Sequence, residues 1–314
     1  MKRKAIIISL STTYLTSYEK RIIKKEKPWG IILFKRNIIS SEQIINLIKS
    51  IKMIANDKKF PILVDEEGGR VTRLTNLIMN QFSQKYFGDL FDINKQIGLA
   101  TYKSYIKSVC NVLKNLGINI NTIPVLDLKK KITHKIIGDR SYSNKISSIK
   151  ALGTICNKIY KKNKLGTVIK HIPGHGSAKS DSHLKLPIVN DSFVYLKKND
   201  FKCFQENSSF FAMTAHILYK KIDSKNVSTH SKKIIGEIIR KHIKFKGLII
   251  SDDISMKALK YDIITNAKMA LNAGCNLVLY CEGKTNVSEK LLKSLPYIDL
   301  FTKKKTSEFY KFLS

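Results

Sequence analysis

The sequence predicts a (β/α)₈ barrel, the TIM barrel, formed as a single domain by residues 1–314. Eight short runs rich in Ile, Val and Leu recur along the chain with longer helical stretches between most of them, a pattern typical of buried parallel strands. Several of these runs end in charged or polar residues, where barrel enzymes carry their active sites. No linker rich in Pro, Gly or Ser divides the chain. Its length does not require two domains, because single barrels reach ~250 residues or more.

The expected strands are Ala5–Leu10, Gly30–Phe34, Pro61–Val64, Ile118–Pro124, Thr167–His171, Phe211–His216, Gly247–Ser251 and Cys275–Cys281. Apolar residues at three- and four-residue spacing predict helices over Ser41–Ala55, Ile97–Leu116, Ile146–Asn163, Ser231–His242 and Ile263–Asn272. A capping box from Thr16 to Glu19 opens a further helix. Gly117, Gly166 and Gly274 stand where helices are expected to end.

The formal net charge of +33 comes from 50 Lys and 7 Arg against 24 acidic residues. The Lys residues are spread along the whole chain, whereas a nucleic-acid binder typically clusters Arg and aromatic residues on one element. Runs such as Lys129–Lys131 and Lys303–Lys305 are expected in loops or near the terminus. We therefore interpret the charge as a diffuse solvated surface and expect no specific nucleic-acid partner.

The five cysteines are odd in number and contain no Cys-x-x-Cys pair, which argues against a disulfide framework and a Cys-rich zinc site. A reducing compartment fits this usage best. No stretch approaches the ~18 apolar residues that cross a membrane. The apolar run near the N-terminus has only six residues and is interpreted as a strand, not as a signal peptide. We expect a cytoplasmic monomer with no membrane partner.

The segment 170–183, KHIPGHGSAKSDSH, holds three His and one Asp just after an apolar strand. His171 and His175 have the spacing of a helical zinc pair, but Pro173 and Gly174 disfavour a regular helix there. The alternative is a Gly-rich loop that carries Asp181 and His183 over a site. In that arrangement a carboxylate orients an imidazole and favours its charged form, which makes a proton donor near neutral pH.

Other candidate residues follow predicted strands. Ser251-Asp252-Asp253 comes after the run GLII, so at least one carboxylate is expected at the barrel mouth, although Asp and Ser there also suit a helix N-cap. Asp65 occupies the same kind of position, and His216 ends the sixth strand. Four of the seven Arg lie in loop or motif segments, where planar donors hold sugar hydroxyls or carboxylates better than Lys: Arg36, Arg70, Arg73 and Arg140.

Six ordered motifs resemble the β-N-acetylglucosaminidases of glycoside hydrolase family 3. They are VDEEGGRVTRL at 64–74, PVLDL at 124–128, IGDRSY at 137–142, KHIPGHG followed by DSH at 170–183, MTAH at 213–216 and SDDISM at 251–256. The resemblance runs from about Ile31 to the region of Cys275. It implies a TIM barrel that removes terminal β-linked N-acetylglucosamine with retention of configuration. In bacteria such enzymes typically act on cytoplasmic muropeptides during cell-wall recycling.

The resemblance also implies roles for individual residues. Asp252 matches the family nucleophile, and His183 matches its acid/base group with Asp181 as partner. The positions that bind the sugar correspond to Asp65, Arg73, Arg140, Lys170 and His171. No cofactor and no metal are implied, and the partner is a small carbohydrate or muropeptide substrate. Glu66 stands where Gln is common, and Ile172 where Phe is common.

Two other classes remain open from the residues. A metal-dependent hydrolase on the same barrel would use His171, His175 and His183 with an Asp as ligands. A non-catalytic basic barrel would bind sugar or nucleic acid without turnover. The sequence does not decide whether the natural substrate is a muropeptide or a chitooligosaccharide. It also does not decide whether the reaction is hydrolysis or phosphorolysis. A neutral His repels an incoming anion less than a carboxylate does, so phosphate could replace water as acceptor.

Overall fold

The computed structural model describes residues 2–182 and 184–314, and its centre is a closed barrel of parallel strands. The strand order is β1-β10-β9-β7-β5-β4-β3-β2, with every neighbouring pair parallel. The barrel strands are β1 (Lys4–Ser9), β2 (Pro28–Leu33), β3 (Ile62–Val64), β4 (Ile120–Asn121), β5 (Gly166–Ile172), β7 (Phe211–Thr214), β9 (Leu248–Asp253) and β10 (Leu277–Tyr280). Each predicted strand overlaps one of them, so the (β/α)₈ prediction is confirmed.

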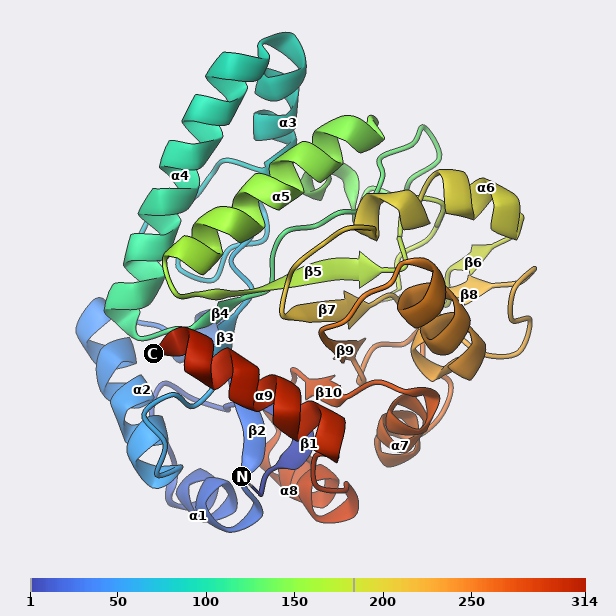
Figure 1. The fold of residues 1–314 in the computed structure, drawn as a ribbon. Helices are drawn as coiled ribbons and strands as arrows, with labels where there is room; N and C mark the ends of the chain where they lie inside the picture. Colours follow the sequence, from blue (N-terminus) through green and yellow to red (C-terminus); the bar gives the residue numbers. More distant parts are fainter. Residues whose placement is uncertain (1, 183) are drawn as a thin grey trace.

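The barrel strands are apolar because both of their faces are covered. Every residue of β1, β2 and β5 is buried. One face of each strand points into the barrel and the other packs under the surrounding helices, as expected for a parallel sheet. Figure 1 shows this ring of helices around the strands.

The helices that follow the predicted pattern are α1 (Ser17–Glu26), α2 (Ser41–Ile54), α4 (Lys95–Leu116), α5 (Ile146–Lys162) and α7 (Ile263–Ala273). The stretch predicted as a helix over 231–242 forms a π-helix, Ile234–His242, whose hydrogen bonds span five residues. Among residues 2–182 and 184–314 the structure adds four α-helices that the pattern did not single out: α3 (Gln84–Ile93), α6 (Phe193–Lys198), α8 (Thr285–Ser294) and α9 (Leu300–Leu313).

The predicted helix ends are mostly confirmed. The Thr16 hydroxyl accepts from the Glu19 backbone N–H and the Glu19 carboxylate accepts from the Thr16 N–H, which is the expected capping box. Gly117 and Gly274 end α4 and α7 with φ of 84° and 113°. Gly166 does not cap α5; it opens β5, where an added Cβ would meet the Phe309 ring at 2.9 Å.

A short parallel pair lies outside the barrel and joins two of its loops. β6 (Ile188–Val189) belongs to the segment after β5, and β8 (Leu218–Tyr219) belongs to the segment after β7. Both segments leave the carboxyl ends of their strands. This pair therefore links two neighbouring loops on the side of the barrel where a (β/α)₈ enzyme holds its site.

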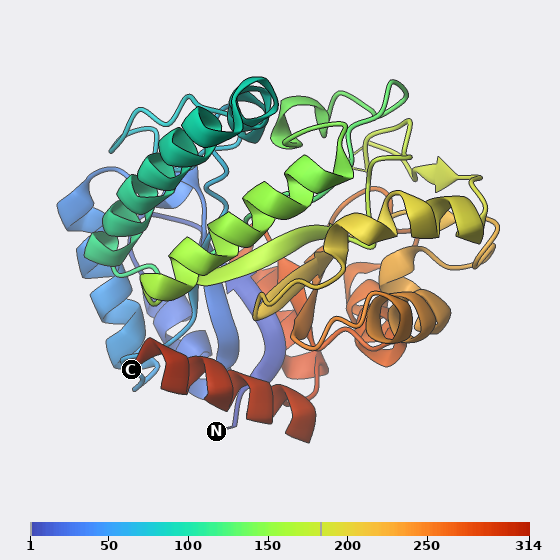
Figure 2. The ribbon, with the colours of Figure 1, turned by 45° about the horizontal axis from the view of Figure 1, so that its top comes forward.

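Helix α9 closes the opposite end of the barrel. Phe309 packs edge-on against Phe211 near the start of β7, with ring centroids 5.0 Å apart, and Phe211 contacts Trp29 at the start of β2. The Trp29 indole N–H donates to the Thr306 hydroxyl of α9 at 2.9 Å. Figures 1 and 2 show α9, the dark red helix, lying across the barrel close to the N-terminus.

We predict that Phe309→Ala lowers the free energy of unfolding by about 3–5 kcal/mol, because Phe309 is fully buried and its removal leaves a cavity under the barrel. Leu300→Ala on the same helix is the control, since Leu300 is 85% exposed and its truncation should cost less than about 0.5 kcal/mol. Urea denaturation of both variants measures the difference. Equal losses would show that α9 is not a packed part of the core.

Candidate active site

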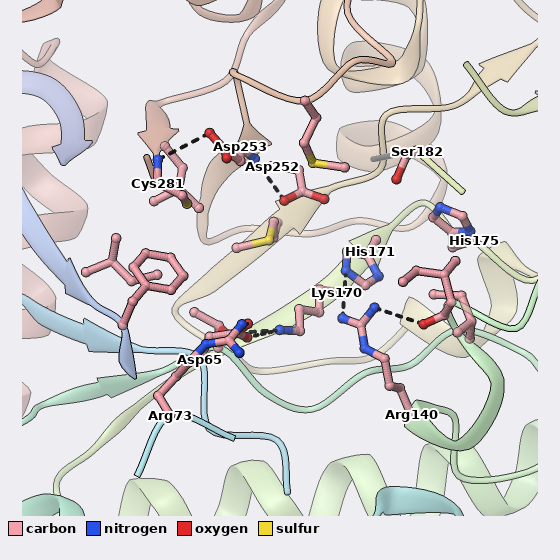
Figure 3. Close-up of a pocket in the computed structure, with 18 residues that line it drawn as sticks. Asp65, Arg73, Arg140, Lys170, His171, His175, Ser182, Asp252, Asp253 and Cys281 are labelled. Carbon is pink, nitrogen blue, oxygen red and sulfur yellow. Dashed lines mark hydrogen bonds and ion pairs between the residues drawn. The ribbon is translucent and has the colours of Figure 1, made fainter. Parts of the chain in front are cut away.

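A pocket opens at the carboxyl ends of the barrel strands, where the sequence predicted the site (Figure 3). Polar residues from β5, from the end of β9 and from the segments after β3 and β4 face apolar residues from β2, β7 and β10. The described lining residues are Ile32, Phe34, Asp65, Arg73, Thr122, Ile136, Ile137, Arg140, Lys170, His171, His175, Ser182, Met213, Asp252, Asp253, Met256, Leu279 and Cys281.

Asp65 forms two ion pairs on one side of this pocket. Its Oδ1 lies 2.5 Å from the Lys170 ammonium and accepts from the Thr122 hydroxyl at 2.5 Å, while Oδ2 lies 2.6 Å from Arg73. Burial alone would raise the pKa of Asp65, but Lys170 and Arg73 lower that pKa far below its ordinary value. Asp65 is therefore a carboxylate at any physiological pH and acts only as an acceptor.

Glu67 connects two cations of the site. Its carboxylate accepts both hydrogen bonds of a fork from Arg140, each 2.8 Å long, and lies 2.6 Å from the Lys170 ammonium. Burial opposes ionisation, but Arg140 and Lys170 lower the pKa of Glu67, and Glu67 in turn raises the pKa of Arg140. Because Lys170 also pairs with Asp65, these four side chains and Arg73 form one continuous network.

His171 is oriented by a buried carboxylate. Its Nδ1 lies 2.7 Å from Asp127 Oδ2, and its Nε2 lies 3.4 Å from an Arg140 nitrogen. A guanidinium can only donate, so in this arrangement Nδ1 carries the proton and Nε2 accepts. Asp127 also accepts the backbone N–H of His175 at 2.6 Å and thereby fixes the start of the loop after β5.

His175 lines the pocket beside Ser182, and burial lowers the pKa of its imidazole to about 4. It is therefore neutral at neutral pH. The rings of His171 and His175 are 5.8 Å apart, in an edge-to-face arrangement. Among residues 2–182 and 184–314, no three His, Cys, Asp or Glu side chains are placed to hold a metal ion. The described residues thus give no support to the alternative of a metal-ligand cluster, whose third member, His183, lies outside them.

Asp252 and Asp253 end β9 with different surroundings. Asp253 accepts from the Ser255 backbone N–H at 3.1 Å and the Ser255 hydroxyl at 2.7 Å, and also from the Cys281 N–H at 3.2 Å. Burial raises its pKa. Asp252 accepts the backbone N–H of Asp253 at 2.8 Å, and Figure 3 shows its carboxylate facing the centre of the pocket. Asp253 therefore stabilises the turn, while Asp252 lines the open pocket.

The loop after β5 reaches the site next to Asp252. Its base is held by buried Asp200, which accepts from the Ser177 backbone N–H at 3.1 Å and pairs with Lys130. Farther along, the Ser182 carbonyl accepts from the Ala258 N–H at 3.2 Å. Ala258 lies in the segment that follows Asp252, so the two loops meet there. Asp181 precedes Ser182; His183 lies outside the described residues.

The sequence profile of the glycosyl hydrolase family 3 N-terminal domain matches residues 7–303. The chain belongs to glycosyl hydrolase family 3. A protein named β-hexosaminidase from Haemophilus influenzae is 32% identical over 293 residues, which cover 91% of this chain and 82% of that protein. The β-hexosaminidase of Actinobacillus succinogenes is 32% identical over 305 residues, which cover 94% and 87%.

Solved structures of this family share the fold. The crystal structure of NagZ from Neisseria gonorrhoeae in complex with N-trifluoroacetyl-D-glucosamine matches with a TM-score of 0.90 and 27% identity, over all of this chain and 90% of that one. A fungal multi-domain family 3 β-N-acetylglucosaminidase matches with a TM-score of 0.88 and 25% identity, over 98% of this chain and 38% of that one.

In this family 3 member, one pocket brings together six of the eight predicted site residues: Asp65, Arg73, Arg140, Lys170, His171 and Asp252. Asp181 lies one residue from the lining residue Ser182. Sequence reasoning did not single out Glu67, Asp127 or Thr122, which hold the cations and His171 in place. Glu67 and Asp127 lie inside the motifs VDEEGG and PVLDL. Their place in these motifs was the one feature of the sequence that could have marked them as site residues.

We predict that Glu67→Gln lowers the free energy of unfolding by about 3 kcal/mol, because it removes the anion shared by two buried cations of the family 3 site. The control is Glu206→Gln, which breaks an ion pair with Lys150 at an 81% exposed carboxylate and should cost far less, because solvent and salt screen that pair. Chemical denaturation at neutral pH measures both. A Glu67 variant as stable as the control would contradict a structural role for the network.

Proposed function

We propose that this family 3 enzyme is a retaining exo-β-N-acetylglucosaminidase in which Asp252 is the nucleophile. The observation that carries the proposal is the placement of Asp252 in one pocket with Asp65, Arg73, Lys170 and His171. The names of its relatives, β-hexosaminidase and β-N-acetylglucosaminidase, support the substrate class.

The polar side of the pocket suits the hydroxyl groups of one terminal sugar. Asp65 accepts hydrogen bonds from hydroxyls, while Arg73, Arg140 and Lys170 donate to hydroxyl oxygens. The opposite side carries Met213, Met256 and Leu279, which suit an apolar sugar face and an acetamido methyl group. In this proposal the five residues Asp65, Arg73, Arg140, Lys170 and His171 bind the sugar, and binding is exo because only the terminal ring enters the pocket.

The proposed reaction has two displacement steps. In the first, an Asp252 carboxylate oxygen attacks the anomeric carbon, the bond to the glycosidic oxygen breaks, and His183 gives its proton to that oxygen. In the second, His183 takes a proton from water, the water oxygen attacks the anomeric carbon, and the bond to Asp252 breaks. Two displacements on opposite faces give retention. Asp181 holds the imidazole and favours its charged form before the first step.

The biological setting is part of the proposal. We infer that the chain acts as one barrel domain over 1–314, as a cytoplasmic monomer, on small N-acetylglucosaminyl fragments of muropeptide type and without a specific nucleic-acid or membrane partner. Among the described helices, none combines the length and apolarity needed to span a membrane. Rates on a disaccharide muropeptide and on chitobiose, each measured with and without phosphate, test the substrate and the acceptor. Unchanged turnover in EDTA excludes the metal-dependent alternative.

We predict that Asp252→Asn lowers kcat by roughly 10³-fold or more, the scale seen when an enzymatic nucleophile is removed, because the amide is not an anionic nucleophile. Asp253→Asn is the matched control and should lose less than about 10-fold, since an Asn oxygen can still accept from Ser255 and Cys281. Turnover of a chromogenic N-acetylglucosaminide measures both.

The same assignment is tested chemically. A slow fluorinated N-acetylglucosaminide should leave a covalent label on Asp252, detectable by mass spectrometry in a peptide covering Gly247 to Lys257. A label on Asp253 or on another carboxylate, or a product of inverted configuration, would overturn the proposal.

We predict that His183→Ala slows substrates with poor leaving groups by ~10²–10⁴-fold, because these need a proton on the departing oxygen. Substrates with an acidic phenol should lose much less in the glycosylation step. Pre-steady-state release of the phenol across a leaving-group series measures this difference. An equal loss for good and poor leaving groups would argue against His183 as the acid.

A further inference from the structure

His216 lies in the segment just after β7, in the MTAH motif, and the proposed mechanism gives it no role. Its side chain is fully buried, as are the side chains of Thr214 and Thr229. Burying a polar group is costly unless it is hydrogen-bonded, so three such groups in one place need explanation. Their contacts lead to the backbone of Asp252 and Asp253.

A chain of hydrogen bonds joins these residues to the end of β9. The Asp252 backbone N–H donates to the Thr214 hydroxyl at 3.4 Å, and the Thr214 and Thr229 hydroxyls are 2.8 Å apart. The Thr229 hydroxyl lies 2.7 Å from His216 Nδ1. His216 Nε2 then lies 3.0 Å from the Asp253 carbonyl oxygen.

The direction of each bond follows from which groups can donate. The Asp253 carbonyl can only accept, so His216 Nε2 carries a proton. In a neutral imidazole Nδ1 then accepts from the Thr229 hydroxyl at 2.7 Å, which is nearer to that hydroxyl than its other acceptor, the Ala215 carbonyl at 3.3 Å. Thr229 accepts from Thr214, and Thr214 accepts from the Asp252 N–H. Each threonine hydroxyl therefore donates once and accepts once within this chain.

The chain of hydrogen bonds holds the peptide unit before Asp252 and the peptide unit after Asp253. One end holds the N–H of Asp252 and the other holds the carbonyl of Asp253, while the Asp253 N–H is taken by the Asp252 carboxylate at 2.8 Å. The backbone that carries Asp252 is therefore fixed by Thr214 at the end of β7, by His216 just after it and, through them, by Thr229. A displacement of ~1 Å at a reacting group can cost ~10²-fold in rate.

We propose that His216, Thr229 and Thr214 are positioning residues that hold the Asp252 carboxylate at its attacking geometry. This rests on the proposed function, because it assumes that Asp252 is the nucleophile. None of the three residues needs to touch the sugar for this role. Loss of the chain should thus reduce kcat and leave sugar binding largely unchanged.

The test is a pair of substitutions at Thr229. Thr229→Val keeps the shape and removes the hydroxyl, and should lower kcat by ~10–100-fold with KM within about 2-fold of the wild type. Thr229→Ser restores the hydroxyl and should keep kcat within about 2-fold. Thr214→Val should act in the same direction as Thr229→Val. Chromogenic turnover gives kcat and KM, and the rate of trapping by the fluorinated glycoside reports attack by Asp252 directly.

Thr306→Val is the matched control, because Thr306 is also fully buried and hydrogen-bonded but lies on α9 at the far end of the barrel. It should leave kcat and the trapping rate unchanged even if it lowers stability. Thermal melting of all variants separates unfolding from mispositioning. If Thr229→Val does not fold, the kcat and trapping rate of Thr214→Val test the positioning role instead.

The outcomes distinguish the two proposals. If wild-type protein is labelled on Asp252 and the valine variants at 229 and 214 are trapped at the wild-type rate, the positioning role is wrong and the proposed function stands. The positioning role is also wrong if Thr229→Ser is as slow as Thr229→Val, or if the loss is in KM alone. If the wild type is labelled elsewhere, the proposed function itself fails.

Discussion

The carboxylates of Asp65 and Glu67 share the ammonium of Lys170, and this buried arrangement is the constraint on which the candidate site depends. Lys170 is 2% exposed, so its charge would be costly without both partners. Arg73 and Arg140 complete the network at its two ends. Because every member is paired, the site can hold three cations and two anions in fixed positions before any sugar arrives, and binding then needs little rearrangement.

Closure of the barrel is what assembles this network. β3, β4 and β5 are neighbours, so Asp65, Thr122 and Lys170 meet where these strands end. Asp252 arrives from β9, on the other side of β7, and faces the same opening. The aromatic cluster around Phe309 lies at the opposite end. Packing that stabilises the barrel is therefore separated from the groups that carry the chemistry, as is usual for this fold.

The sequence predicted the strands well because each is a short apolar run buried on both faces. It did not predict α9, since Lys303–Lys305 interrupt the apolar pattern around Phe309 and Phe312. The residues expected to face the sugar were found from motifs. Glu67 and Asp127 were not, because their partners Arg140 and His171 lie 73 and 44 residues away, and only the folded barrel shows which carboxylates face a cation and which face a ligand.

The charge of the site differs from the charge of the whole chain. Among the described lining residues, the carboxylates Asp65, Asp252 and Asp253 are matched in number by Arg73, Arg140 and Lys170. The chain as a whole carries +33. A balanced pocket favours an uncharged sugar ring, whereas the excess of Lys on the outer surface acts only over about a Debye length, ~8 Å at physiological ionic strength. The pocket residues therefore determine which sugar ring binds, and the charge of the outer surface can vary without altering the chemistry.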